Sequence, residues 1–186
     1  MKRVANLCQE RTLENVVADP NGIKQVAGDL CDTALTDAKA TLHPLLQQVK
    51  PQHLDQRCEF LQAFKHAMER RIARQLAIWQ PCIRAVFEFD NPRGVGTECW
   101  DGTIHLLVMV PQLLNSVKTI GTKLDRDILK RLRRSGWPRF EKTKSIIEIQ
   151  QVTTDEFRRG ISYGAMFLSL YAAPAQVWPS ARKQKD

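Results

Sequence analysis

The stretch that decides the fold is residues 84–110, RAVFEFDNPRGVGTECWDGTIHLLVMV. Apolar and polar side chains alternate over residues 83–89, which predicts a strand with one buried face. Residues 90–102 are polar and contain three glycines, which predicts a loop. The run at 103–110 is apolar with almost no alternation, typical of a strand covered on both faces. The stretch therefore predicts two strands joined by a long polar loop.

Helical periodicity lies on both sides of this stretch. Residues 54–80 and 113–135 repeat apolar side chains at intervals of three and four, as one face of a helix does. Pro81 and Gly136 end these two runs. An earlier helix is predicted to begin at Asp19-Pro20, with Asp19 as its cap, and to break at His43-Pro44.

A third strand and a further helix are predicted beyond residue 144. The segment SIIEIQQV at 145–152 reads as the strand, and Thr153 followed by Glu156 fits a capping box that opens the helix. Its inward side chains are predicted to be Phe157, Ile161, Ala165, Leu168 and Ala172. After Pro174 the tail is predicted to be extended.

These elements predict an α+β protein. A helical N-terminal region, residues 1–80, precedes a small mixed sheet packed with helices, residues 81–186, which includes the basic helix and the extended tail. The predicted strands lie near 83–89, 103–110 and 145–152. At 186 residues the two parts are expected to form one compact unit with an adequate core.

Composition narrows the class of protein further. No apolar run approaches the roughly 20 residues that a membrane span needs, and the N-terminus lacks a signal-peptide core, so a cytoplasmic protein is expected. The five cysteines include no CxxC pair, and the histidines fall in no zinc-ligand spacing. We expect reduced, mostly buried thiols, no metal and no cofactor.

The order of elements and the segment FDNPRGVGTECWDGTIHLLVMVP resemble the polymerase-β-like nucleotidyltransferase superfamily. In that family a strand ends in Gly-Ser, a polar loop follows, and a second strand opens with Asp-x-Asp and continues as Leu-Leu-Val. The resemblance covers about residues 54–152 and depends on the spacing, on Arg93-Gly94 and on Leu106-Leu107-Val108. It implies a nucleotidyltransferase-like fold.

The chain departs from that family at the positions that carry its chemistry. Asp90-Asn91 stands in place of Gly-Ser, and Thr103-Ile104-His105 stands in place of Asp-x-Asp. Glu148 matches the place of the third carboxylate. Two divalent ions about 4 Å apart need several anionic oxygen ligands, which this set does not supply. The resemblance therefore implies the shape without nucleotidyl transfer, with a vestigial cleft formed by Asp90, Asn91, Arg93, Thr103, His105 and Glu148.

Other enzymatic interpretations have less support. Cys99 and His105 offer a nucleophile and a base, although a loop thiol and a strand histidine explain them equally. Gly94-Val95-Gly96 lacks the third glycine of a dinucleotide fingerprint. A surviving nucleotide-binding role for the loop at 90–102 stays open.

Positive charge is concentrated in one segment. The chain has a formal net charge of +8, and residues 123–144 alone hold nine basic and three acidic residues. The predicted binding surface consists of Lys123, Arg126, Lys130, Arg133, Arg134, Trp137 and Arg139. The alternative is a solvated helix face with Trp137 and Phe140 tucked into the core.

The sequence thus favours a non-catalytic accessory protein that binds nucleic acid, RNA in particular. Lys130, Arg133 and Arg134 would contact phosphates, and Trp137 would stack on a base. The competing class is a structural or assembly factor that docks on an acidic protein surface. The partner, the pathway and the oligomeric state are left open.

Overall fold

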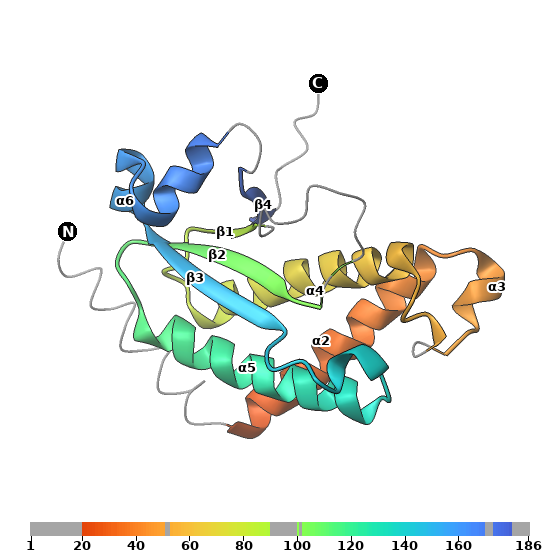
Figure 1. Cartoon of the computed structure of the whole chain (residues 1–186). Coiled ribbons are helices and arrows are strands. Elements are labelled where there is room, and N and C mark those ends of the chain that lie inside the picture. Colours follow the sequence, from red (N-terminus) through yellow and green to blue (C-terminus); the bar gives the residue numbers. More distant parts are fainter. Residues whose placement is uncertain (1–19, 51–52, 90–99, 101, 170–172, 180–186) are drawn as a thin grey trace.

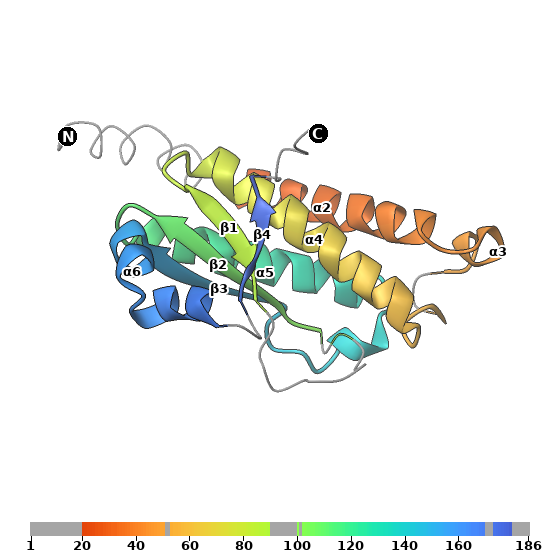
Figure 2. The ribbon, with the colours of Figure 1, turned by 90° about the horizontal axis from the view of Figure 1, so that it is seen from above.

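The structure is a computed structural model that describes residues 20–50, 53–89, 100, 102–169 and 173–179. A mixed four-stranded sheet lies between two unequal helical layers (Figure 1). Helices α2 (Pro20–Ala40), α4 (Cys58–Trp79) and α5 (Asn115–Arg134) cover one face. The short helix α6 (Thr154–Arg159) and the 3-10 helix η3 (Ser162–Leu168) lie on the other side, as Figures 1 and 2 show. The predicted α+β class is confirmed.

The long helices form where the apolar period predicted them. The predicted stripes are buried on α4 and α5, including Phe64, Met68 and Ile72 on α4. Helix α2 begins at Pro20, and the predicted break leaves a separate short helix, α3 (Pro44–Gln47). His43 caps α3, because its Nδ1 accepts the backbone N–H of Leu45 at 3.4 Å.

The sheet has the strand order β3-β2-β1-β4. Its members are β1 (Ala85–Glu88), β2 (Ile104–Val110), β3 (Ile147–Thr153) and β4 (Ala175–Trp178). Strand β1 pairs antiparallel with β2 and β4, whereas β2 and β3 are parallel. Three of these strands were predicted. The extended tail contributes the fourth, an edge strand beside β1.

Helix α5 makes the crossover between the parallel strands β2 and β3, and it is hydrogen-bonded to the β3 segment through its N-cap residue and through a residue in its middle. The Oδ1 of Asp125 accepts the backbone N–H groups of Ile146 (2.7 Å) and Ile147 (2.9 Å). The Gln151 side chain accepts from the backbone N–H of Leu114 and donates to its carbonyl, at 2.9 and 3.0 Å. These bonds set the height and direction of α5 against the sheet.

Alternate residues of the strands feed two apolar clusters. The larger one joins α2, α4 and α5 to the sheet and runs from Ile23 to Ile147. The smaller one lies on the opposite face, where Phe87 packs against Phe167 of η3 with ring centroids 4.7 Å apart. Strand β2 is buried on both faces, as its unbroken apolar run predicted.

The prediction of a long helix after residue 153 is wrong. The capping box between Thr153 and Glu156 is present, but α6 ends at Arg159. Gly160 has φ +61°, a left-handed conformation that stops the helix, and a 3-10 helix follows. Phe157, Ile161 and Leu168, predicted to face inward, are 40, 40 and 72% exposed. The apolar spacing was real, but the helix it implied does not continue.

The cysteines differ from expectation at one position. Cys31 is a free thiol, and its burial in the core raises its pKa to about 12. Cys58 is disulfide-bonded, so the expectation of reduced thiols is wrong at that residue. Cys8 and Cys99 lie outside the described residues.

Candidate functional site

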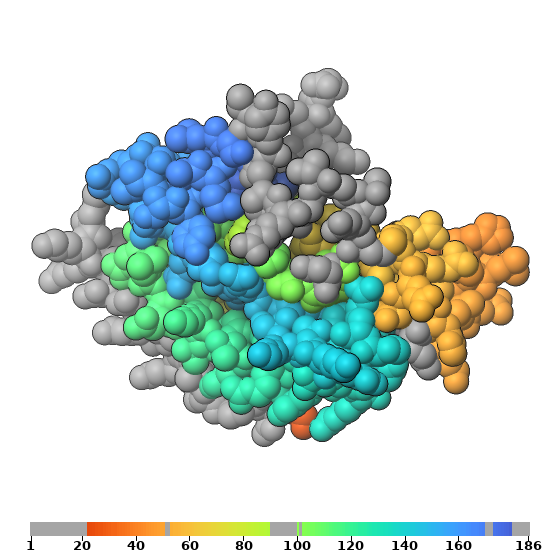
Figure 3. Space-filling model, in the orientation of Figure 1, coloured from red at the N-terminus to blue at the C-terminus, as the bar shows by residue number. Residues whose placement is uncertain are grey.

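Helix α5 carries the basic residues on the side away from the sheet. Its apolar stripe is buried, and as a consequence Arg126, Lys130 and Arg134 are exposed while Lys123 is half-buried. Figure 3 shows α5 along the lower surface of the molecule. Four cations of the predicted binding surface therefore lie off the buried stripe of α5.

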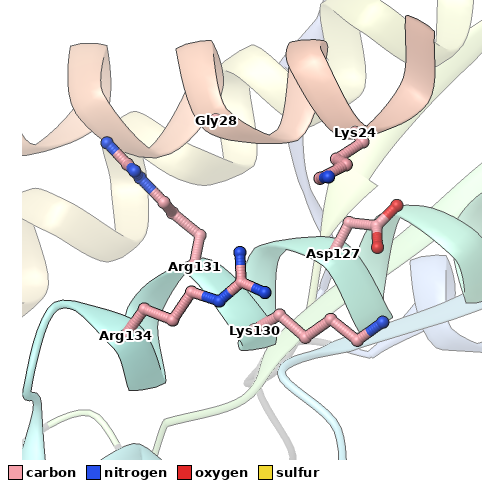
Figure 4. A pocket seen from close by; sticks show the side chains of 6 residues that line it. All are labelled: Lys24, Gly28, Asp127, Lys130, Arg131 and Arg134. Carbon is pink, nitrogen blue, oxygen red and sulfur yellow. The ribbon is translucent and has the colours of Figure 1, made fainter. Parts of the chain in front are cut away.

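A cavity of about 250 Å³ lies between α5 and α2 (Figure 4). Lys24 and Gly28 line it from α2, and Asp127, Lys130, Arg131 and Arg134 line it from α5. Among the described residues Lys24, Lys130 and Arg134 have no ion-pair partner. Lys24 lies about a hundred residues from the predicted segment, and no local pattern in the sequence linked the two.

Arg131 plays a different part at the same cavity. Its Nη2 donates to both carboxylate oxygens of Asp32 on α2, at 2.9 and 2.8 Å. This contact, made by one nitrogen to both carboxylate oxygens, raises the pKa of the guanidinium and ties α5 to α2. Because Asp32 opposes its charge, Arg131 holds α5 against α2, whereas Lys24, Lys130 and Arg134 line the cavity without an ion pair among the described residues.

Two arginines of the predicted binding surface already form hydrogen bonds or ion pairs within the protein. Arg133 donates to the carbonyl oxygens of Phe140 (3.0 Å) and Thr143 (2.6 Å), which holds the turn after α5. Arg139 forms an ion pair with Asp55 at 2.9 Å and donates to the Trp100 carbonyl at 2.6 Å. Both guanidinium groups therefore brace the chain in this conformation.

The predicted stacking role of Trp137 is incompatible with its position. Its side chain is fully buried (0% exposed), with ring centroids 5.3 Å from Phe64 and 5.5 Å from Phe140. Phe140 is buried to the same extent. The alternative that placed both aromatic residues in the core is the correct one, because the turn after α5 folds back onto α4.

The vestigial cleft is only partly described. Asp90, Asn91 and Arg93 lie outside the described residues. Thr103 precedes β2, and His105 on β2 is the register partner of Glu148 on β3.

The His105–Glu148 pair is in direct contact. The His105 Nδ1 and Glu148 Oε2 atoms lie 3.1 Å apart. The His105 ring also packs near Phe89, with centroids 5.5 Å apart, and Gln150 donates to Glu148 Oε1 at 2.9 Å. Within the described chain no third residue completes a metal-ligand group with this pair.

A second polar cluster, which the sequence did not reveal, joins α4 to β1. The Nδ1 of His66 lies 3.1 Å from Glu69 Oε2 and 3.4 Å from Glu88 Oε2. Lys65 Nζ lies 3.6 Å from the other oxygen of Glu69, and both of these side chains are buried. The signal was present as Lys65 and Glu69 one turn apart on a buried helix face, but charges at that spacing usually lie at the surface.

The environment of this cluster shifts the pKa values of its members. Hydrogen bonds to Glu69 and Glu88 raise the pKa of His66 to about 10. Burial raises the pKa of Glu69 to about 7, and the hydrogen bond from His66 lowers that of Glu88 to about 2.

The same three side chains have the spacing of a metal site. One donor atom from each lies within 4.8 Å of the others. However, a histidine that holds its proton at neutral pH is a poor ligand, and Lys65 already supplies positive charge beside Glu69. The arrangement fits an internal ion network better than a metal centre.

Comparisons with known proteins identify no relative. The chain matches no protein-family model, no curated protein and no solved structure. The resemblance to nucleotidyltransferases is thus a hypothesis that depends on the residues named above. Within the described part of the chain no helix is both long and apolar enough to cross a membrane.

Proposed function

We propose that this protein is a non-catalytic accessory protein that binds nucleic acid, RNA in particular. Its binding surface, here called the α5 surface, consists of Lys24, Lys123, Arg126, Lys130 and Arg134. The observation that supports this proposal is the cavity between α2 and α5, which Lys24, Lys130 and Arg134 line without an ion-pair partner among the described residues, beside one carboxylate, that of Asp127. An excess of cations of this kind attracts an anion such as a phosphate.

The chemistry of the α5 surface favours contact with the phosphate backbone over base reading. Lysine and arginine neutralise phosphates and displace counterions, so binding weakens as salt rises. With Trp137 in the core, the surface lacks the aromatic platform that the sequence suggested. We therefore expect affinity with little sequence preference.

A charge-matched pair of variants tests the proposal. Lys130→Ala with Arg134→Ala removes two cations from the cavity, whereas Lys50→Ala with Arg158→Ala removes two exposed cations that lie outside α5. Fluorescence anisotropy with labelled RNA and DNA, at several salt concentrations, measures affinity and its salt dependence. For single-stranded RNA the slope of log K against log salt is expected to fall by about 0.7 per lost phosphate contact in the cavity variant only.

Either of two results would contradict this assignment. One is the absence of RNA binding by the wild type at low salt. The other is an equal loss in both double variants, since net charge alone would then explain binding. Stronger binding to DNA than to RNA of the same length would correct the class of nucleic acid.

We further propose that the sheet is a nucleotidyltransferase-like scaffold that has lost its catalytic metal site. The support is that His105 and Glu148, which match the places of two of the family's carboxylates, are neighbours on parallel strands, and that a histidine–carboxylate contact replaces an acidic pair there. Incubation with nucleoside triphosphates and magnesium should give no turnover. Magnesium-dependent transfer would overturn this view.

The expected cytoplasmic location also belongs to this proposal. The disulfide at Cys58 is the observation against it, since disulfides are rare in the cytosol. Thiol labelling of the protein in intact cells would decide the matter, because a reduced Cys58 reacts and an oxidised one does not.

Docking on an acidic protein partner is the second candidate function. The observation that favours it is a group of exposed apolar side chains on α6 and η3, namely Phe157, Ile161, Tyr163 and Leu168. Arg158 lies exposed beside them. A defined protein recovered by pull-down after nuclease treatment, and lost with Leu168→Asp, would support this candidate over RNA binding.

A further inference from the structure

A second cationic cavity, of about 240 Å³, lies between α4 and the edge strand β4. Arg70, Arg71 and Arg74 line it from α4, Asp37 from α2, and Trp178 from β4. Its charged lining sums to +2, with three arginines against one aspartate. β4 and α2 lie far from these arginines along the chain, so only the folded structure brings the lining residues together.

The three arginines differ in how far their guanidinium groups are already hydrogen-bonded within the protein. Arg71 is held by Asp37, to which its Nε donates at 3.2 Å. Arg70 donates its Nε–H to the carbonyl of His66 at 3.2 Å, and its two terminal nitrogens have no acceptor among the described residues. Arg74 has no hydrogen bond or ion pair to any other described residue. Arg70 and Arg74 lie one turn apart, so both can reach one anion.

Trp178 gives the cavity an aromatic wall. The other three tryptophans, Trp79, Trp100 and Trp137, are buried in the core, whereas Trp178 is only partly buried. Its position follows from the pairing of β4 with β1, in which Trp178 is the register partner of Val86. A partly exposed indole beside unpaired guanidinium groups combines the two elements that recognise a phosphate and a base.

We propose that this cavity binds a nucleotide, with its phosphate on Arg70 and Arg74 and its base against Trp178. The volume is below the roughly 300–1,000 Å³ typical of drug-sized ligands, which suits one nucleotide unit. The unit is either a free nucleotide or the phosphorylated end of an RNA strand, and both present the same chemistry.

This site is separate from the α5 surface. Along α2, Asp32 contacts Arg131 of α5, whereas Asp37 contacts Arg71 of α4, five residues later and on the other flank of the helix. The inference therefore stands without the proposed function. The two cavities share no lining residue, so substitutions in the lining of one leave the lining of the other unchanged.

Tryptophan fluorescence tests the nucleotide site directly, because Trp178 is the indole nearest to solvent. The probes are a nucleoside 5′-monophosphate, the same nucleoside without phosphate, and inorganic phosphate. The monophosphate is expected to quench emission and to bind at least tenfold more tightly than either fragment. Quenching should disappear in Trp178→Phe, and Arg70→Ala with Arg74→Ala should lower affinity at least tenfold.

Controls separate this site from general charge effects. Lys118→Ala with Arg158→Ala removes the same charge elsewhere and should leave quenching unchanged, as should Lys130→Ala with Arg134→Ala. Circular dichroism confirms that each variant is folded. Undiminished quenching in folded Trp178→Phe, or unchanged affinity in the folded Arg70/Arg74 variant, would overturn the proposal, as would inorganic phosphate binding as tightly as the nucleotide.

Two RNA probes identify the source of the nucleotide. RNA with a 5′-phosphate that binds more tightly than its 5′-hydroxyl counterpart, with the difference lost in the Arg70/Arg74 variant, indicates a strand end. Equal binding of both RNAs with tight binding of the monophosphate indicates a free nucleotide. If neither RNA end nor monophosphate depends on Arg70 and Arg74, the site does not exist.

Discussion

Replacing Glu69 by leucine is expected to lower the free energy of unfolding by about 3–5 kcal/mol. The Glu69 side chain is 1% exposed and that of Lys65 is 7% exposed, with Nζ 3.6 Å from Oε1. The substitution leaves the Lys65 ammonium buried without this carboxylate, and breaking a buried pair costs more than the pair itself contributes. His66 loses one of its two carboxylate partners as well.

A second substitution isolates the pair. Adding Lys65→Met to Glu69→Leu removes the ammonium that the first change stranded, so the double variant should regain most of the lost stability. Urea unfolding followed by circular dichroism measures each free energy, and an unchanged m-value shows that the unfolded state is the same. The control is Arg159→Ala, which breaks an exposed ion pair with Asp155 and should cost less than about 1 kcal/mol.

Lys65→Met alone completes the comparison. If the losses in free energy of Lys65→Met and Glu69→Leu simply add in the double variant, the reasoning is refuted, because Lys65 and Glu69 would then not depend on each other. A loss below about 1 kcal/mol for Glu69→Leu would do the same, since the pair would then behave like a surface ion pair.

Four further predictions follow from the pKa of His66, the burial of Trp137 and the backbone geometry at Gly164. The free energy of unfolding should fall as the pH rises from 6.5 to 10, because hydrogen bonds to Glu69 and then to Glu88 raise the pKa of His66 from 6.5 to about 10. The midpoint of urea unfolding, measured across this pH range, reports the fall. In His66→Gln the midpoint should depend less on pH. Trp137→Ala should cost about 3–5 kcal/mol in urea unfolding. Trp137→Phe, if folded, should bind RNA as tightly as the wild type, because the buried Trp137 side chain cannot reach a base. Loss of RNA binding in this variant would instead support stacking of a base on Trp137. Gly164→Ala should lower the melting temperature, because its Cβ would clash with the backbone carbonyl oxygen of Glu156. Gly28→Ala should not, because no atom lies within 4 Å of the added Cβ.

The local elements were predictable where a period continued without interruption. The predicted helices at 54–80 and 113–135 correspond to Cys58–Trp79 and Asn115–Arg134, and the run at 103–110 corresponds to Ile104–Val110. The same reasoning failed after Arg159, where apolar spacing suggested a helix that Gly160 ends. A left-handed glycine outweighs a weak periodic signal.

The candidate site was predictable only as a charge distribution. The helical period placed Arg126, Lys130 and Arg134 on the outer face of α5, as observed. Trp137 and Arg139 follow the helix in a turn, where no period indicates direction, and they point into the core and toward Asp55. The proposed nucleotide site could not be predicted from the sequence, because its arginines lie beside β4 only in the folded chain.

The sequence by itself determined which segments are helices and strands and where positive charge accumulates, since both depend on residues within a few turns of one another. Tertiary structure decided which of those charges remain available. It paired Arg131 with Asp32 and Arg71 with Asp37, and it brought Lys24 beside Lys130. The physical reason is distance, because a guanidinium is neutralised only by a carboxylate within hydrogen-bond reach, and packing alone brings such partners together from remote parts of the chain.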